Sequence, residues 1–389
     1  MLRILTAGES HGPACVTIIE GMPAGIRVRV EDINQDLKRR HSDFGRGGRG
    51  LIEEDKAEIL SGIRYGKTLG SPITLIARNL DFAHWQDEMR IEETEHKAAK
   101  MTTPRPGHAD LAGALKYGQD DIRNISERAS ARETVGRVMA GAVIRKLLLE
   151  FGIRLASHTV QIGPVRLTRL PADFEEVAKV FETDPEIRCL DPKTSRKMKQ
   201  VILEARNKKD TLGGVVEVIA SSVPTGLGSV MHYDRRLDGR IAQALMSIPS
   251  VKAVEIGNGF AGAAMLGAEF QDQIAYKGHR FTRKTNNMGG MEGGMSNGED
   301  IVCRAYHKPL STLGVALKTI DIATRRSGLT TVERSDICAV PRAGVISEAM
   351  LALVLGEAMI EKFGGDHIAE MKRNSHSYIK SQLEKYDAT

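Results

Sequence analysis

The chain has 389 residues, of which 41% are hydrophobic and 27% are charged, a balance typical of a soluble globular protein with one or two domains. The net charge of +5 is small for this length and aromatic residues make up only 4%, so we expect no nucleic-acid partner. No run approaches the roughly 18 apolar residues of a membrane span, and residues 1–6 lack the apolar stretch of a signal peptide, so we expect no membrane association and a cytoplasmic location.

The four cysteines argue against a disulfide framework and against a metal site. Cys15, Cys189, Cys303 and Cys338 are scattered along the chain, with no C-x-x-C pair and no clustered histidine beside them. We therefore expect reduced thiols in or near the core and no bound metal.

The N-terminal part of the chain is predicted to contain two short strands followed by a long helix. Residues 16–19 and 73–76 are short strand-like runs, set off by Pro-x-Gly turns. Residues 127–151 instead repeat their apolar side chains at helical spacing, and Gly152 supplies a stop signal.

The C-terminal part begins with a change of character. Residues 171–210 form two charged, helix-prone stretches, which predict a peripheral excursion with solvated faces and no chemistry of its own. A strand is then predicted at 215–219 and a helix at 347–363. That helix is apolar nearly all round, which indicates either a core helix buried between layers or a helix at a subunit contact. The polar tail, residues 367–389, is expected to fray.

The connections between the strands favour antiparallel or mixed sheets with helices over a doubly wound parallel sheet, because turns join them instead of regular helical crossovers. We therefore predict an α+β fold in one domain over residues 1–389. A weak internal echo accompanies it: residues 16–40, with Pro23 and Gly25, resemble residues 216–246, with Pro224 and Gly226. The spacing differs by one residue, so a duplicated core and coincidence both stay open.

The densest unusual segment, residues 39–50, places four arginines and four glycines within twelve positions. Guanidinium groups bind phosphate and carboxylate through paired hydrogen bonds, and glycine lets backbone N–H groups approach an anion closely. The segment therefore predicts an anion-binding loop. A flexible basic loop without function and a contact with nucleic acid are the alternatives.

Two formal G-x-G-x-x-G motifs raise the alternative of a nucleotide-dependent oxidoreductase. The copy at 45–50 follows a charged helix-like stretch instead of a strand. The copy at 257–262 does follow a plausible strand at 251–256, but no helix and acidic strand end come after it, as a dinucleotide-binding fold requires. This alternative therefore depends on the second copy alone.

Two histidines lie in settings that do not resemble core packing. His11 follows the first strand between glycines, and His108 follows Arg105 in a rigid Pro-Gly turn. An imidazole beside an anionic substrate can be held protonated and can act as a general acid towards a leaving phosphate. Either histidine alone is compatible with a surface turn, but both stand near arginine-rich or glycine-rich loops, which favours a catalytic role.

Two further segments are candidates for ligand contact. Residues 123–132 are rich in arginine and serine and lead into the long helix, which predicts an anion seat at a helix N-terminus or an ordinary serine cap with a charged first turn. Residues 286–297 are glycine-rich and predict a loop that closes over a ligand or a disordered surface loop.

Taken together, these segments resemble the chorismate synthase family. The matching blocks follow the family's order along nearly the entire chain and are residues 8–12, 39–49, 105–110, 127–134, 289–294, 308–312 and 334–336. Ala129 stands where many members have serine, and Phe44 where many have tyrosine. Neither departure removes a charged or titrating group.

The resemblance implies a carbon–oxygen lyase that converts 5-enolpyruvylshikimate 3-phosphate to chorismate and phosphate, the last common step of the shikimate pathway to aromatic amino acids. The reaction is a 1,4-anti elimination that requires reduced FMN, which lends electron density as the phosphate leaves. Whether NADPH reduces the flavin on the same chain stays open. The resemblance also implies a compact β-α-β sandwich of antiparallel sheets and helical layers, and a homotetramer.

The resemblance also assigns roles residue by residue. His11 would protonate or stabilise the leaving phosphate, His108 would stabilise the reduced flavin, and Asp336 would assist removal of the proton near flavin N5. The phosphate and carboxylate groups of the substrate or NADP would be bound by Ser10, Arg40, Arg46, Arg49, Arg105 and Arg132. The flavin contacts would come from Arg128, Ala129, Ser130, Pro249, Ser250, Gly293, Lys308, Pro309, Leu310, Ser311, Thr312 and Arg334.

Overall fold

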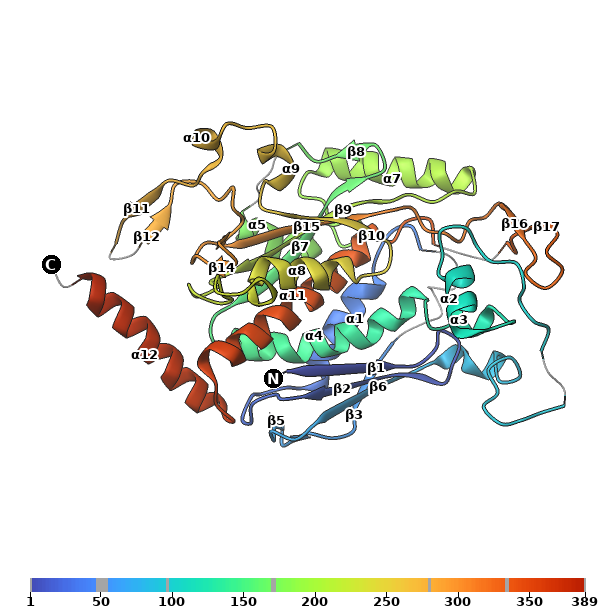
Figure 1. The fold of residues 1–389 in the computed structure, drawn as a ribbon, viewed down its shortest axis with the longest axis horizontal. Coiled ribbons are helices and arrows are strands. Elements are labelled where there is room, and N and C mark those ends of the chain that lie inside the picture. Colours follow the sequence, from blue (N-terminus) through green and yellow to red (C-terminus); the bar gives the residue numbers. More distant parts are fainter. Residues whose placement is uncertain are drawn as a thin grey trace.

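Two antiparallel sheets enclose a layer of helices in the computed structural model, which describes residues 2–46, 55–95, 98–168, 173–278, 281–332 and 336–387 (Figure 1). The first sheet has the strand order β1-β2-β6-β3, with β1 (Arg3–Ala7), β2 (Ala14–Glu20), β3 (Ala57–Ile59) and β6 (Ile73–Arg78). The second has the order β10-β15-β9-β7-β8, with β7 (Arg154–Ile162), β8 (Val165–Arg166), β9 (Gly214–Ser221), β10 (Val251–Ile256) and β15 (Ile301–His307). The three predicted strands and the α+β class are confirmed.

The middle layer consists of four helices whose apolar faces meet both sheets. They are α1 (Val30–His41), α4 (Thr134–Leu149), α8 (Leu237–Met246) and α11 (Val340–Phe363). Helix α4 packs directly on α11, and a Cβ added at Gly141 would lie 2.4 Å from the Cβ of Ala349, so this crossing requires glycine. The four cysteines are buried free thiols, as expected.

Helix α11 is apolar nearly all round because neighbours surround it on every side. It contacts α1, α4, α8 and the strands β7 and β9, and 78% of its most apolar 18-residue window is buried inside the protein. By length and composition it could cross a membrane, but its burial makes it a core helix. It begins at Val340, earlier than the predicted 347, with Pro341 in its first turn, where the missing N–H costs no hydrogen bond.

Helix α4 begins at Thr134, later than predicted, because residues 127–133 take up other contacts. A short 3₁₀ turn, η3 (Ala131–Glu133), precedes it, and the carboxylate of Glu127 turns to His11. The apolar periodicity therefore located the helix but not its first turn.

The remaining elements surround this sandwich. The charged segment before β9 contains α5 (Phe174–Ala178), α6 (Val180–Thr183) and α7 (Pro192–Asn207). The polar tail expected to fray forms α12 (Ile368–Asp387) instead, and Met371 is buried while Tyr378 packs against Phe363. The other helices are α2 (Asp110–Tyr117), α3 (Arg123–Ser126), α9 (Gly259–Gly262), α10 (Gly267–Phe270), η2 (Leu80–His84) and η4 (Tyr233–Arg235). Four hairpins are β4 (Ile63–Arg64) with β5 (Lys67–Thr68), β11 (Ile274–Tyr276) with β12 (Phe281–Arg283), β13 (Met291–Glu292) with β14 (Met295–Ser296), and β16 (Lys318–Ile320) with β17 (Ser327–Leu329).

The two sheets repeat one arrangement, so the weak sequence echo reflects a structural duplication. The strands β1, β2, β6 and β3 of the first sheet occupy the same order as β7, β9, β15 and β10 of the second. The connections correspond as well. In the chain β2 is followed by α1 and β9 by α8, and the later strands β6 and β15 are followed, after shorter elements, by the central helices α4 and α11.

Hydrogen bonds at one turn repeat in detail between the halves. The Thr68 hydroxyl donates to the carbonyl of Pro23 at 2.6 Å and accepts from the Ile26 N–H at 3.0 Å. The Ser296 hydroxyl donates to the carbonyl of Pro224 at 2.6 Å and accepts from the N–H of Leu227 at 2.9 Å. Because the same bonds recur at the echoed Pro-x-Gly turns, coincidence is excluded as their explanation.

Candidate active site

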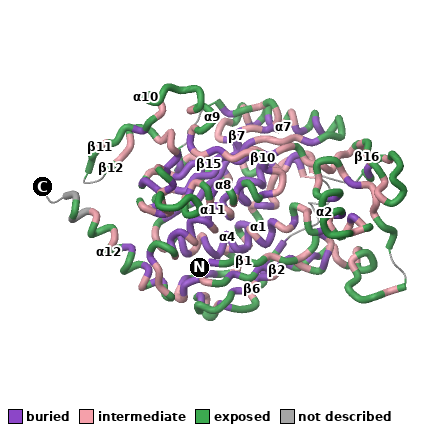
Figure 2. The backbone as a smooth tube through the Cα atoms, viewed as in Figure 1, coloured by how far each residue is buried: buried purple, intermediate pink, exposed green. Residues whose placement is uncertain are grey.

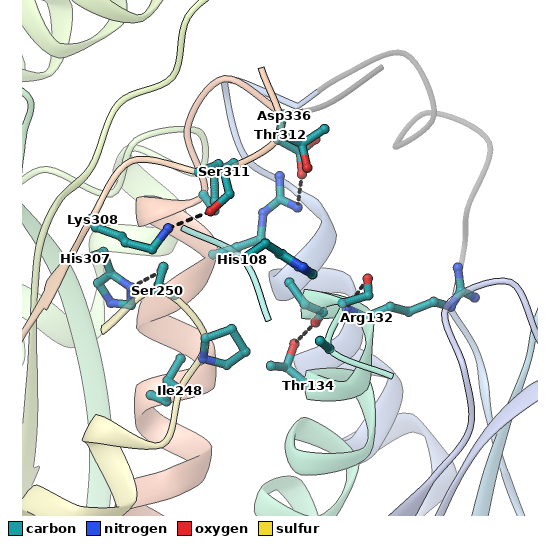
Figure 3. A pocket seen from close by; sticks show the side chains of 18 of the residues that line it. His108, Arg132, Thr134, Ile248, Ser250, His307, Lys308, Ser311, Thr312 and Asp336 are labelled. Atoms are coloured by element: carbon teal, nitrogen blue, oxygen red, sulfur yellow. Dashed lines mark hydrogen bonds and ion pairs between the residues drawn. The ribbon is translucent and has the colours of Figure 1, made fainter. Parts of the chain in front are cut away.

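A cavity of about 620 Å³ lies where the central helices α4 and α11 begin, and Thr134 and Val340 from their first turns line it (Figure 3). The duplication places both helix N-termini at this one end of the sandwich. Helix N-termini present unpaired N–H groups and partial positive charge, so a cavity between two of them favours anions.

The cavity brings together most of the residues predicted for the site. Its lining includes Ser10, His11, Arg40, Arg46, Arg105, His108, Ala129, Ser130, Arg132, Pro249, Ser250, Lys308, Leu310, Ser311, Thr312 and Asp336. Figure 3 shows Ser250, His307 and Lys308 on one side of the cavity and Arg132 and Thr134 on the other. The two sides come from different halves of the duplicated fold.

A few predicted residues lie elsewhere. Gly293 is in the β13–β14 hairpin, and neither it nor Pro309 lines the cavity. The Arg128 guanidinium also turns away and donates to the carbonyls of Thr6 and Gly8 at 3.0 and 3.1 Å, which ties down the loop that carries His11. Arg49 and Arg334 lie outside the described residues.

Asp55 organises the arginines of the cavity, although no motif pointed to it. Its buried carboxylate accepts hydrogen bonds from His41 at 2.7 Å and Arg132 at 3.0 Å, and it lies 3.5 Å from Arg40. Burial raises the pKa of Asp55, but the bond from His41 and the charges of both arginines outweigh burial and bring it to about 2. The carboxylate therefore holds both guanidinium groups in place while staying ionised.

Positive charge still exceeds negative charge in this cluster. Burial lowers the pKa of Arg40, and repulsion from Arg342, Arg132 and Arg46 adds to this despite the attraction of Asp55. A guanidinium group that is destabilised in this way is favourable only if an anion offsets the charge on binding. The cluster is therefore suited to a substrate with several negative groups.

His11 is held on three sides. Its Nδ1 lies 2.7 Å from Oε1 of Glu127, and its backbone N–H donates to Oε2 of the same carboxylate at 2.8 Å. Its ring lies against Trp85 at 3.8 Å between centroids, with the two planes tilted by 31°. Nε2 is buried and has no hydrogen-bond partner among the described residues. The side chain thus has Nδ1 fixed by Glu127 and Nε2 without a partner, and His11 is one of the residues that line the cavity.

His108 is fixed by a carboxylate in the same way. Its Nδ1 lies 2.5 Å from Oδ1 of Asp110, whose other oxygen accepts from the Arg105 Nε at 2.9 Å. Burial raises the pKa of Asp110, but the bonds from His108 and Arg105 hold it well below its usual value. Arg105 also donates to Thr312 at 3.0 Å, so its guanidinium connects two loops of the wall and is largely engaged within the protein.

The wall of the cavity that comes from the second half of the fold supplies a carboxylate, Asp336, and several polar side chains. Asp336 accepts from Nη1 of Arg342 at 2.8 Å, and Arg342 also donates to Asp43 at 3.0 Å, which anchors Asp336 to the start of α11. The ring of His307 bonds to the hydroxyl of Ser250 at 2.9 Å, and burial lowers the pKa of His307 to about 4, so this ring is neutral at pH 7.

The structure does not support the dinucleotide-binding alternative. Gly257 follows β10, which pairs antiparallel with β15, and the next helix, α9, has four residues. A dinucleotide site of this type needs a parallel strand-helix-strand unit. The glycine motif therefore marks a turn.

Comparison with known proteins agrees with the geometry. The family profile described as chorismate synthase matches residues 2–360. The chain belongs to the chorismate synthase family. It is 52% identical to the chorismate synthase of Moorella thermoacetica over 379 residues, which cover 97% of this chain and 98% of that protein. It is 49% identical to the chorismate synthase of Solibacter usitatus, with 99% of this chain and 100% of that protein covered.

A solved structure described as a chorismate synthase crystal structure has the same fold as this family member. The TM-score is 0.79 at 41% sequence identity, and the match covers 98% of both chains. The predicted sandwich of antiparallel sheets and helical layers is therefore confirmed for this chain.

Proposed function

We propose that the chain is a carbon–oxygen lyase that eliminates phosphate from 5-enolpyruvylshikimate 3-phosphate in the 1,4-anti sense to give chorismate, with reduced FMN as cofactor, in the cytoplasm. The observation that carries the proposal is the single cavity in which two fixed histidines and Asp336 face a cluster of arginines at two helix N-termini. Each feature answers one demand of the reaction: anion binding, proton delivery and proton removal.

Substrate binding is the task of the arginines. Arg40 and Arg132, held by Asp55, present an excess of positive charge beside the first turn of α4. The substrate carries a phosphate and carboxylates, and charge-assisted bonds to guanidinium groups are strong and directional. These residues therefore bind the substrate and also stabilise the charge that builds up on the departing phosphate.

His11 supplies the proton for the leaving group. Its Nε2 is the ring nitrogen without a partner, and Ser10 beside it bonds to Ser130 at 3.1 Å. A proton or hydrogen bond delivered to the phosphate oxygen lowers the barrier to breaking the carbon–oxygen bond, because the departing charge is neutralised. Asp336, on the opposite wall, is the candidate acceptor for the proton that the substrate loses.

The residues of the second wall fit a flavin with its phosphate-bearing chain. The cavity volume suits a cofactor together with a small substrate. Lys308 donates to the Ser311 hydroxyl at 2.7 Å, and that hydroxyl donates to the carbonyl of Gly107 at 2.8 Å, so the loops around residues 107 and 308–311 form one wall. Reduced flavin supplies electron density during phosphate release and recovers it afterwards. We assign to His108, whose Nδ1 lies against Asp110, the donation of a hydrogen bond to such a group.

An anaerobic assay tests this function. With photoreduced FMN the chain is expected to release phosphate and form chorismate in equal amounts, and with oxidised FMN alone it is expected to release neither. Absence of phosphate release under reduced, anaerobic conditions contradicts the proposal. Adding NADPH to the oxidised-FMN sample then decides whether the chain reduces its own flavin or receives it reduced.

We also propose that the chain forms the homotetramer expected for its family. No described helix covers the outer face of the first sheet (Figure 1), and Figure 2 shows exposed and intermediate positions along β1, β2 and β6. There Leu5 is 54% and Ile18 is 37% exposed, and the two are direct partners across β1 and β2. Such an apolar sheet face is buried when a second copy packs on it. Sedimentation of wild type and of Leu5→Glu tests this, and a monomer in wild type would refute it.

A further inference from the structure

Both carboxylate oxygens of Glu127 contact the same residue, His11. Oε2 accepts the backbone N–H of His11 at 2.8 Å and Oε1 faces Nδ1 at 2.7 Å, while the carbonyl of Glu127 accepts the N–H of Ser10 at 3.0 Å. The segment before η3 therefore fixes both the loop and the ring. Because a carboxylate only accepts, Nδ1 carries a proton, and the ring cannot flip without losing this bond.

The surroundings make this contact strong. The side chain of Glu127 is 6% exposed and that of His11 is 14% exposed, and Trp85 covers one face of the imidazole. Burial raises the pKa of Glu127, but the bonds and charge of His11 outweigh it and the pKa lies below its usual value.

We propose that Glu127 is the positioning residue of phosphate release, holding His11 in the doubly protonated form with Nε2–H directed at the leaving group; this rests on the proposed role of His11. As the carbon–oxygen bond breaks, its electron pair leaves with the phosphate. The proton moves from Nε2 of His11 to a phosphate oxygen. His11 becomes neutral with Nδ1–H still bonded to Glu127, which stays ionised throughout.

Other charged groups lie near the contact between Glu127 and His11. Arg123, from α3, favours the carboxylate form of Glu127. Its guanidinium lies 5.7 Å from the Trp85 ring, so it also opposes a positive charge on His11. Asp81 accepts from the Trp85 indole at 3.0 Å and also contacts His84, both in or next to η2. None of the described residues other than Glu127 is bonded to the His11 ring, so the effect of Glu127 is separable.

The chain offers a direct readout because Trp85 is its single tryptophan and lies against His11. Protonated imidazole quenches indole fluorescence, so a pH titration of the fluorescence of the full chain reports the protonation of His11. We expect one midpoint that His11→Asn abolishes. Glu127→Gln is expected to move that midpoint down by about one pH unit or more, as loss of a close carboxylate does. Glu127→Asp, which keeps the charge and shortens the reach, should give an intermediate midpoint.

The rate of phosphate release provides a second, independent measurement. In Glu127→Gln the kcat for phosphate release at pH 7 is expected to fall about 10-fold or more, with KM for the substrate nearly unchanged, and lowering the pH should restore part of it. Glu133→Gln is the matched control, since Glu133 bonds to Arg137 instead and should leave the midpoint unmoved. An unchanged midpoint in folded Glu127→Gln would overturn the inference even if wild type is active. An inactive wild type with a shifted midpoint would instead refute only the proposed reaction.

Discussion

The two halves of the duplicated fold share their strand order and turn bonds, yet they contribute different chemistry to the cavity between them. The first half supplies His11 with Glu127, and the arginines Arg40 and Arg132. The second half supplies Asp336 and a polar wall that consists of Ser250, His307, Lys308, Ser311 and Thr312. A repeated scaffold thus yields one asymmetric site, because loops carry the chemistry while strands and helices carry the symmetry.

The outer faces of the two sheets differ as well. On the second sheet a buried polar ladder runs across four strands: His158 bonds to Glu217 at 2.8 Å, Glu217 to Arg304 at 2.7 Å, and Arg304 lies 3.2 Å from Glu255. On the first sheet the corresponding face exposes apolar side chains such as Leu5. The outer face of the second sheet is therefore filled by polar side chains that bond to one another, whereas that of the first sheet exposes apolar side chains.

The largest expected effect comes from replacing the two histidines of the site, which should lower activity without affecting the fold. His11→Asn is expected to lower phosphate release by about 10² to 10⁴-fold, the range for a lost general acid, and His108→Asn should also reduce turnover. The anaerobic assay measures both, with thermal unfolding to show that the fold is retained. Full activity in either variant would remove that histidine from the mechanism.

Removing the carboxylate that holds the arginines should come next. Asp55→Asn is expected to lower the free energy of unfolding by about 3 kcal/mol at pH 7, because it leaves buried guanidinium groups without their counter-charge. Since the pKa of Asp55 is lowered in the folded state to about 2, its contribution is present above about pH 4 and disappears as the pH falls towards 2. Urea unfolding of both proteins at pH 7 and at low pH checks this, and a difference that does not shrink in acid contradicts it.

The smallest effect tests the duplication itself. Thr68→Ala and Ser296→Ala each remove a buried hydroxyl with the same two hydrogen bonds, so each should lower stability by about 1 to 2 kcal/mol. Loss of the methyl group of Thr68 adds to the first value, and Thr68→Ser is the control for that part. Strongly unequal losses after this correction would show that the two turns are not energetically equivalent.

Sequence patterns predicted the frame of the molecule and the loops of the site, but not the partners within it. His11 and His108 lie in short motifs, so local sequence was enough to select them, whereas Asp336 was selected through the resemblance to the family. Glu127 is 116 positions from His11, and Asp55 is 77 positions from Arg132, so only the fold shows that these pairs meet.

The sequence also misplaced the start of the first long helix for a physical reason. Residues 127–133 keep the composition of a helix, but tertiary bonds to the His11 loop are worth more than the extra helical turn. Trp85 gave no local signal, because its role is defined by the ring that it covers.

The position of α11 in the chain has a consequence for synthesis. This helix ends at Phe363, near the end of the chain, yet it contacts α4 from the first half and both β7 and β9 from the second. The first sheet can pack on α1 and α4 as soon as these helices are made, but the inner face of β7 and β9 lacks α11 until the helix has left the ribosome. The apolar surface of the second sheet therefore stays open through most of translation, and the nascent chain depends on fast closure or on chaperones at that moment.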